Sequence, residues 1–155
     1  MKSFWYDSKI GKILLTSDGE YLTGLYFENQ KYFPKSIGDE INLPIFDQTI
    51  NWLELYFAGR NPEFIPRIKI SGTEFQKMVY ESLLKIPFGT VETYGSIAKN
   101  LNTSARAVGN AVAKNPISII IPCHRVIGEN ENLIGYSAGL DRKKFLLDLE
   151  KRSSL

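Results

Sequence analysis

The chain has 155 residues, of which 43% are hydrophobic and 23% are charged, and its formal net charge is +2. This composition is typical of a globular chain and excludes a disordered one. The sequence contains no apolar run of the length that a membrane span needs. Its amino-terminal residues also lack the apolar stretch of a secretory signal, so we expect a soluble, cytoplasmic protein with no membrane partner.

The length suits one ordinary domain or two small ones, and the charge is uneven along it. Residues 1–70 contain 8 Lys/Arg and 9 Asp/Glu, a net charge of −1, whereas residues 71–155 contain 11 and 8, a net charge of +3. The weak positive field therefore belongs to the second half.

The first half predicts a hairpin and one helix. Residues 12–17 and 21–28 are rich in β-forming side chains and flank a Gly-containing turn. Residues 45–57 place apolar side chains at steps of three and four, as in an amphipathic helix: Phe46, Ile50, Leu53 and Phe57. Two prolines then begin an extended connection, so we expect a small N-terminal β-sheet domain with one helix over residues 1–70.

The second half predicts helices joined by short loops. Thr73 begins a capping-box pattern that opens a helix to about Lys85, and Thr93 caps a short helix over residues 94–101. Thr103 or Ser104 caps the next helix, over roughly 105–114, and a last helix runs over about 140–151. Helix, short turn and helix form either a helix-turn-helix or a packed helical hairpin. The whole chain is expected to have an α+β fold, with a helical C-terminal domain over residues 71–155.

The helix over residues 105–114 carries unusually small side chains: Ala105, Ala107, Gly109, Ala111 and Ala113. A glycine inside a helix costs about 1 kcal/mol relative to alanine. Such a bare helix tolerates close approach by another helix or by a nucleic-acid backbone.

The chemistry of the chain centres on Pro122-Cys123-His124-Arg125, which contains its only cysteine and its only histidine. A lone cysteine forms no internal disulfide, and these two residues cannot supply the ligands of a structural zinc site. The composition leaves a carboxylate-rich magnesium site open, but nothing in the sequence indicates one, so we expect neither a metal nor a cofactor. A cysteine after an apolar run can be a buried structural residue. Here the adjacent His and Arg would favour the thiolate, which is the nucleophilic form.

Consecutive side chains tend to point apart, so His124 would reach Cys123 through a bridging water. The histidine then needs an orienting partner. The last helix offers three acids for this role: Asp141, Asp148 and Glu150.

The segment Ile121-Pro122-Cys123-His124-Arg125-Val126 resembles the active-site signature of the O6-alkylguanine-DNA alkyltransferases. Residues 72–98, 106–128 and 135–150 resemble the family's approach to its helix-turn-helix, its recognition helix with the active-site loop, and its closing segment. The N-terminal half is similar more loosely, and its fold is expected to be ribonuclease-H-like. Tyr80 stands where the family often has Trp. Because the needed ligands are missing, we do not expect the zinc-bearing N-terminal domain of some relatives.

The resemblance implies four catalytic residues. Cys123 would accept the alkyl group, His124 would deprotonate it through a water, and Glu150 would orient His124. Asn115 would hold the turn that carries the active site.

The resemblance also implies substrate contacts. Tyr94 would hydrogen-bond guanine N3 and crowd the target phosphate, while Tyr136 and Ser137 would line the guanine pocket, with the Ser137 amide facing O6. The carbonyls of Cys123 and Val126 would read the exocyclic amine.

The DNA contacts implied by the resemblance lie mainly on the recognition helix, which the family places in the minor groove. Arg106 would fill the gap left by a flipped base. The other residues expected at the DNA are Ala107, Gly109 and Arg125.

The implied function is a stoichiometric, irreversible transfer of the alkyl group of O6-alkylguanine in double-stranded DNA to Cys123 after base flipping, by a monomer. O4-alkylthymine is a second candidate substrate. Two other classes are weighed beside it: a binder of alkylated DNA without catalysis, in which the cysteine is replaced, and a Cys-His hydrolase, which would leave the helix-turn-helix unexplained.

Overall fold

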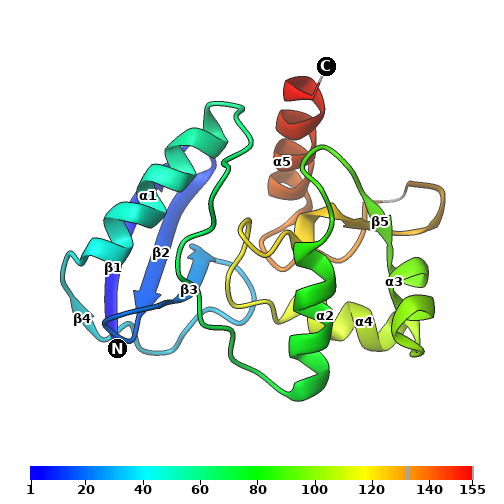
Figure 1. Ribbon diagram of the computed structural model, residues 1–155, viewed down its shortest axis with the longest axis horizontal. Coiled ribbons are helices and arrows are strands. Elements are labelled where there is room, and N and C mark those ends of the chain that lie inside the picture. The colour runs from blue at the N-terminus through cyan, green and yellow to red at the C-terminus, as the bar shows by residue number, and fades with distance from the viewer. Residues whose placement is uncertain (132, 155) are drawn as a thin grey trace.

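The computed structural model describes residues 1–131 and 133–154, and its α+β fold has two parts lying side by side (Figure 1). A small sheet with one helix forms the first part, and four helices around two short strands form the second. This is the fold class expected from the sequence.

The N-terminal sheet has the strand order β3-β2-β1-β4. The strand β2 (Gly11–Ser17) pairs antiparallel with both β1 (Lys2–Ser8) and β3 (Leu22–Phe27), while β4 (Asp39–Glu40) runs parallel to β1. The predicted hairpin is confirmed as β2 and β3. The strands β1 and β4 were not predicted, since both depend on pairing rather than on a strong local pattern.

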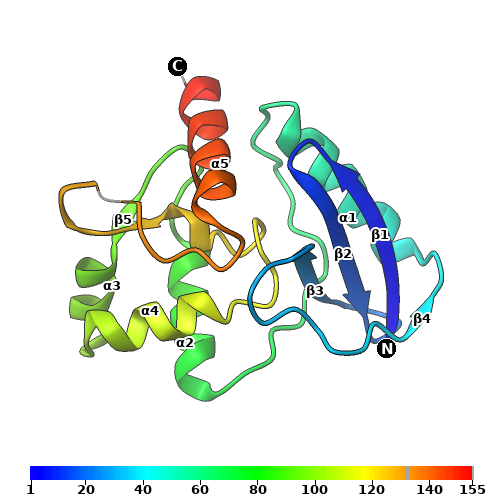
Figure 2. The same ribbon diagram turned by 180° about the vertical axis from the view of Figure 1, so that it is seen from behind.

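The predicted amphipathic helix is confirmed as α1 (Pro44–Phe57). This helix covers one face of the sheet. When the molecule is seen from behind, the sheet lies in front of the helix (Figure 2). Its buried side chains include Phe46 and Leu53, as the spacing predicts.

The predicted helices of the second half are confirmed as α2 (Glu74–Leu84), α3 (Tyr94–Leu101), α4 (Ala105–Ala113) and α5 (Leu140–Ser153). Thr73 and Gln76 form the expected capping box, Thr93 caps α3, and Ser104 rather than Thr103 caps α4. The helix ends differ from the expected ones by one or two residues.

A two-stranded parallel sheet joins β5 (Glu92–Thr93) to β6 (Val126–Ile127). It places the start of α3 beside the segment that follows Cys123. The sequence did not predict it, because each strand has only two residues and its partner lies more than thirty positions away.

The apolar run 117–121 is buried and forms turns. The backbone of Leu25 in β3 holds it from the other side, donating to the Pro116 carbonyl at 2.8 Å and accepting from the Ser118 amide at 3.0 Å. The N-terminal sheet therefore supports the segment that leads to Cys123.

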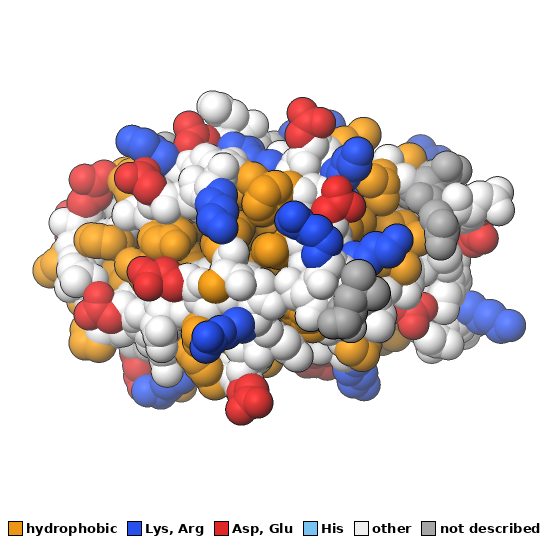
Figure 3. All heavy atoms as spheres, turned by 90° about the horizontal axis from the view of Figure 1, so that it is seen from above, with side chains coloured by type: hydrophobic (Ala, Val, Ile, Leu, Met, Phe, Trp, Pro, Cys, Tyr) orange, Lys and Arg blue, Asp and Glu red, His pale blue; other side chains and the backbone are white. Residues whose placement is uncertain are grey.

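Side chains of both parts join one hydrophobic core, so the division at residue 70 remains a prediction. On the face shown in Figure 3, basic and acidic side chains are interspersed among apolar ones. Within 1–131 and 133–154, the chain forms no helix that is both long and apolar enough for a membrane crossing.

Candidate active site

Cys123 begins a single 3-10 turn, Cys123–Arg125, directly before β6. Pro122 precedes this turn with a fixed backbone, and the Cys123 amide donates to the Ile121 carbonyl at 2.7 Å. The thiol is free and the residue is only 1% exposed. The nucleophile candidate is thus held in packed structure by both its neighbours and its own backbone.

Asn115 fixes the loop that leads to this turn. Its side-chain amide donates to the Ile121 carbonyl at 2.8 Å, and its side-chain oxygen accepts from the Ile117 amide at 3.0 Å. Between them, Ile119 adopts a φ of 70°, a rare conformation for a β-branched residue. Strain of this kind persists only where the surrounding contacts impose it.

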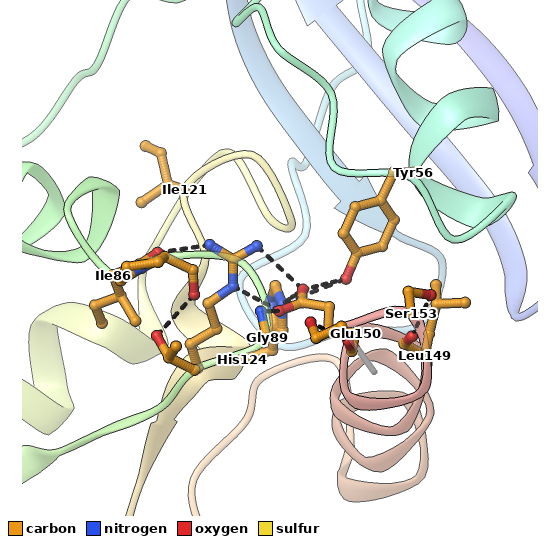
Figure 4. A network of polar contacts seen from close by, with 12 residues as sticks. Tyr56, Ile86, Gly89, Ile121, His124, Leu149, Glu150 and Ser153 are labelled. Carbon is orange, nitrogen blue, oxygen red and sulfur yellow. Dashed lines mark hydrogen bonds and ion pairs between the residues drawn. The ribbon is translucent and has the colours of Figure 1, made fainter.

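His124 is fully buried, and its Nε2 lies 2.6 Å from Oε2 of Glu150 on α5 (Figure 4). Because that carboxylate is ionised, the ring proton belongs on Nε2. The Nδ1 atom has no hydrogen-bond partner among the described residues and is left with a free lone pair. Of the three acids on the last helix, Glu150 is the one that contacts His124, since Asp141 and Asp148 are exposed.

The Glu150 carboxylate accepts bonds from several other groups. Arg125 donates from Nε to Oε1 at 2.8 Å and from Nη2 to Oε2 at 3.2 Å, and the Gly89 amide donates to Oε1 at 3.1 Å. Although burial by itself would raise it, the bonds from His124 and Arg125 hold the pKa of Glu150 well below its usual range. The site therefore contains a permanent carboxylate.

Arg125 does not have the position expected of a DNA contact. It is 8% exposed, and its remaining donor, Nη1, bonds to the Ile86 carbonyl at 2.7 Å. The guanidinium neutralises the charge of the Glu150 carboxylate and binds the Ile86 carbonyl. This burial argues against the expected contact between Arg125 and DNA.

The expected guanine contacts Tyr94, Tyr136 and Ser137 come from the start of α3 and from the segment before α5. Tyr94, the first residue of α3, donates its hydroxyl to the carbonyls of Ile134 and Gly135, both at 3.1 Å. Tyr136 is buried, and its hydroxyl has no partner among the described residues. Ser137 is half-buried, and its carbonyl accepts from the Lys31 amide at 3.1 Å.

Lys143 is a site residue that the sequence analysis missed. It is fully buried on α5, and Nζ donates to the carbonyls of Val126 at 2.5 Å and Ile134 at 2.8 Å. The Val126 carbonyl is the one expected to accept from the exocyclic amine of guanine. Lys143 already occupies one of its two lone pairs, and the second lone pair remains for guanine. The spacing of seven residues between Lys143 and Glu150, which puts both on one helix face, was the available signal.

Burial dominates the electrostatics of the two reactive groups. It raises the pKa of the Cys123 thiol, against which Asn115 and the Lys143 ammonium act. Burial lowers the pKa of His124, although Glu150 opposes this. It also lowers the pKa of Lys143 to about 8 and raises that of Tyr94 to about 12. The neutral thiol beside a neutral imidazole is the resting arrangement that these directions favour.

The other three residues expected at the DNA lie on α4. Arg106 is exposed in its first turn, and Ala107 and Gly109 are half-buried. An added Cβ at Gly109 would lie 3.9 Å from the ring of Tyr94. Tyr94 therefore packs against part of the small-residue surface of α4, and the side chain of Arg106 is exposed to solvent.

Among the described residues, no three His, Cys, Asp or Glu side chains gather in a way that could hold a metal ion. The fold and the site together define a class of protein that combines a DNA-binding type of helix pair with a buried thiol nucleophile.

Comparison with known proteins gives the family. The family profile "6-O-methylguanine DNA methyltransferase, DNA binding domain" matches residues 74–152, and the profile of the same family's ribonuclease-like domain matches residues 1–70. This chain therefore belongs to the 6-O-methylguanine DNA methyltransferase family.

Individual relatives are similar over nearly their whole length. The methylated-DNA–protein-cysteine methyltransferase of Mycobacterium leprae is 45% identical over 151 residues, which cover 96% of this chain and 92% of the relative. The protein of that name from Methanosarcina acetivorans is 47% identical over 150 residues, covering 94% and 95%. The crystal structure of Mycobacterium tuberculosis OGT in complex with DNA matches with a TM-score of 0.91 at 39% identity, covering 99% of this chain and 94% of that one.

Proposed function

We propose that this protein repairs DNA by direct reversal, moving the alkyl group of O6-alkylguanine in duplex DNA onto Sγ of Cys123. The observation that carries the proposal is the buried Cys123 next to a histidine whose Nε2–H is tied to an ionised glutamate. That pairing leaves Nδ1 of His124 as a proton acceptor, which is what a general base needs.

In the proposed step, His124 takes the thiol proton through one water, because no direct hydrogen bond joins Cys123 and His124 in the part of the chain that the structure describes. The thiolate attacks the alkyl carbon, so an S–C bond forms while the C–O6 bond breaks. The electron pair of the broken bond goes to guanine, which a donor at O6 or N3 stabilises. The Ser137 amide and the Tyr94 hydroxyl have those roles in the proposal.

Two features of the site bear on access and turnover. The Tyr94 hydroxyl would exchange its carbonyl partners for guanine when the flipped base enters. The thioether product has no good leaving group, so each molecule would react once. A reducing cytoplasm would keep Cys123 as a free thiol.

The DNA side of the proposal rests on α3 and α4. We infer that α4 lies against the minor groove and that Arg106 enters the stack in place of the flipped guanine. Asn115 would keep the Cys123 turn in register through both of its side-chain bonds.

The test is the intact mass of the protein after incubation with a duplex that contains one O6-methylguanine. We expect one added methyl group per molecule, located on Cys123 by peptide mapping, and no further demethylation once the protein is consumed. Cys123→Ser should bind the duplex within a few-fold of the native affinity and gain no methyl group.

Continued turnover, or a methyl group on another residue, would contradict the proposal. Tight binding of the damaged duplex by the native protein without any mass change would identify a non-catalytic binder. A Cys-His hydrolase would instead release product repeatedly from an acyl substrate.

A further inference from the structure

One polar group of the site comes from the N-terminal part of the chain. Tyr56, on α1, is fully buried and donates its hydroxyl to Oε2 of Glu150 at 2.5 Å. Figure 4 shows it pointing across from the N-terminal part toward Glu150 on α5. Every residue given a catalytic, substrate or DNA role so far lies after residue 93, and this contact has no place in the proposed mechanism.

The geometry shows how the hydroxyl and the imidazole are related. The Tyr56 oxygen lies 3.4 Å from His124 Nε2, a longer distance than either group has to Glu150 Oε2. Both groups therefore act as donors that converge on one carboxylate oxygen, rather than bonding to each other. Burial, and then the Glu150 charge, raise the pKa of Tyr56 well above its usual range, so the hydroxyl remains a donor.

The ring of Tyr56 is fixed on several sides. It stacks on Trp52 at a centroid distance of 5.4 Å and meets Phe57 and Phe88 edge-on at 5.6 and 6.0 Å. A ring packed in this way cannot swing out, so the hydroxyl stays directed at Glu150.

We propose that Tyr56 is a positioning residue of the reaction site, whose hydroxyl holds Oε2 of Glu150 and thereby sets how strongly that carboxylate favours a proton on His124. This inference rests on the proposed function only in naming His124 as the base. It makes the N-terminal part a contributor to the chemistry as well as to the fold.

The physical reason is the sharing of one negative charge. Each donor to Oε2 withdraws part of the charge that would otherwise stabilise an imidazolium. Without the Tyr56 hydroxyl, the carboxylate would bind the protonated ring more strongly, and His124 would be protonated at a higher pH. A protonated His124 has no lone pair to accept the thiol proton.

Removal of the Tyr56 hydroxyl leaves the other groups that act on His124 unchanged. Burial and the neighbouring cations lower its pKa, and the carboxylate raises it. The titratable or charged groups that act on it are Tyr56 of α1, Arg125 of its own turn, and Lys143 and Glu150 of α5, and Cys123 precedes it in the chain.

The experiment uses the full chain without DNA. Because His124 is the only histidine, a sample labelled in its histidine ring gives one set of imidazole NMR signals. We expect the native protein to show the Nε2–H tautomer. Tyr56→Phe should move the titration of that ring upward by roughly one pH unit, the change expected when a bond to a charged group is lost.

The matched control is Thr49→Val, which removes another fully buried hydroxyl from α1. Among the described residues, that hydroxyl bonds to the Ile45 carbonyl alone. It should leave the His124 titration unchanged even if it lowers stability. A merely structural role of Tyr56 would lower the melting temperature of both variants and move the titration of neither.

Two results would overturn the inference. One is an unchanged titration in folded Tyr56→Phe. The other needs no variant: a native spectrum with the ring proton on Nδ1 would mean that the two donors do not share Oε2. Neither result involves alkyl transfer, so failure of the proposed repair function would be seen separately, in the mass experiment.

Discussion

Glu150 connects the polar groups of the site, since its two oxygens accept five hydrogen bonds, from Tyr56, Gly89, His124 and Arg125. A buried carboxylate is stable only when its lone pairs are used in this way. The arrangement explains why Arg125, next to the nucleophile, is turned inward. Because Glu150 stays ionised, His124 is the group of this network whose protonation changes with pH.

The unfolding free energy should fall as pH drops below about 6.5, the ordinary pKa of histidine. The folded protein lowers the pKa of His124, so the unfolded state binds more protons in this window, and the stability present above pH 6.5 is lost on acidification. The slope from this one group can be at most about 1.4 kcal/mol per pH unit. Urea denaturation at several pH values measures it.

His124→Gln is the control, because it removes the only histidine. Its stability should be lower at pH 7.5 but nearly flat between pH 7 and 5.5. Glu150 has a lowered pKa, so its own contribution is lost only below the unfolded value of about 4.3. Equal slopes in the two proteins would show that His124 titrates normally in the folded state.

Arg106→Ala should slow methyl transfer from duplex DNA by about ten-fold or more. Flipping a base out of the duplex costs a few kcal/mol, and the Arg106 side chain would recover part of this by taking the place of the flipped base in the stack. Reaction with free O6-methylguanine base should be nearly unchanged, since Arg106 is exposed on α4 whereas Cys123 is buried. Single-turnover rates on both substrates give the answer.

Arg60→Ala is the matched control: this exposed arginine follows α1 in the N-terminal part. It should change neither rate appreciably. If Arg106→Ala slowed both substrates equally, Arg106 would support the fold or the pocket instead of base flipping.

At the scale of elements, the pair α3 and α4 is built from local signals. Thr93 and Ser104 each accept from the amide three residues later, and Asn102 ends α3 in the left-handed conformation. These capping interactions fix the ends of α3 and α4, so that the apolar faces of the two helices pack into the core. As a result Tyr94 stands at the start of one helix and against Gly109 of the next.

Gly109→Ala should stabilise the protein by up to about 1 kcal/mol, because the new methyl group would make an ordinary contact with Tyr94 and the helix gains propensity. Gly109→Leu should instead displace the Tyr94 ring and slow transfer even from the free base. Thermal unfolding and single-turnover rates of both variants test this. A destabilised Gly109→Ala would show that α4 and Tyr94 are packed too closely for any side chain.

At the scale of the whole molecule, α5 ties the two parts together at two points. Near its start, Arg142 donates to the carbonyls of Ile10 at 2.8 Å and Glu28 at 3.0 Å and lies over the Phe27 ring. Farther along, Glu150 accepts from Tyr56. A disturbance at Cys123 is therefore transmitted to a core that includes both parts.

Methylation of Cys123 should destabilise the folded protein. The residue is 1% exposed, and adding a methyl group to a packed site typically costs about 1–3 kcal/mol. The melting temperature should fall by roughly 2–8 °C per kcal/mol. The measurement compares thermal unfolding before and after full reaction with a methylated oligonucleotide, with the DNA product removed.

Bulkier alkyl groups should lower the melting temperature further, and Cys123→Ser treated in the same way should show no change. An unchanged or raised melting temperature in the reacted native protein would mean that the site has room for the product.

The sequence by itself determined the parts of this protein that depend on neighbouring residues. The helix caps at Thr73 and Thr93 were predicted from patterns three or four residues long, because a capping bond spans that distance. The motif around Cys123 likewise identified the family, and it gave the candidate nucleophile from adjacent residues.

Only the tertiary structure decided which side chains meet across the site. Tyr56 and Glu150 are 94 positions apart, and Arg125 bonds to Ile86 across 39. Local pattern carries no information on such pairs, because packing between elements, and not the chain around each residue, brings the partners together. For the same reason the sequence placed Arg125 at the DNA and overlooked Lys143, whereas in the fold Arg125 bonds to Glu150 and Lys143 bonds to two backbone carbonyls.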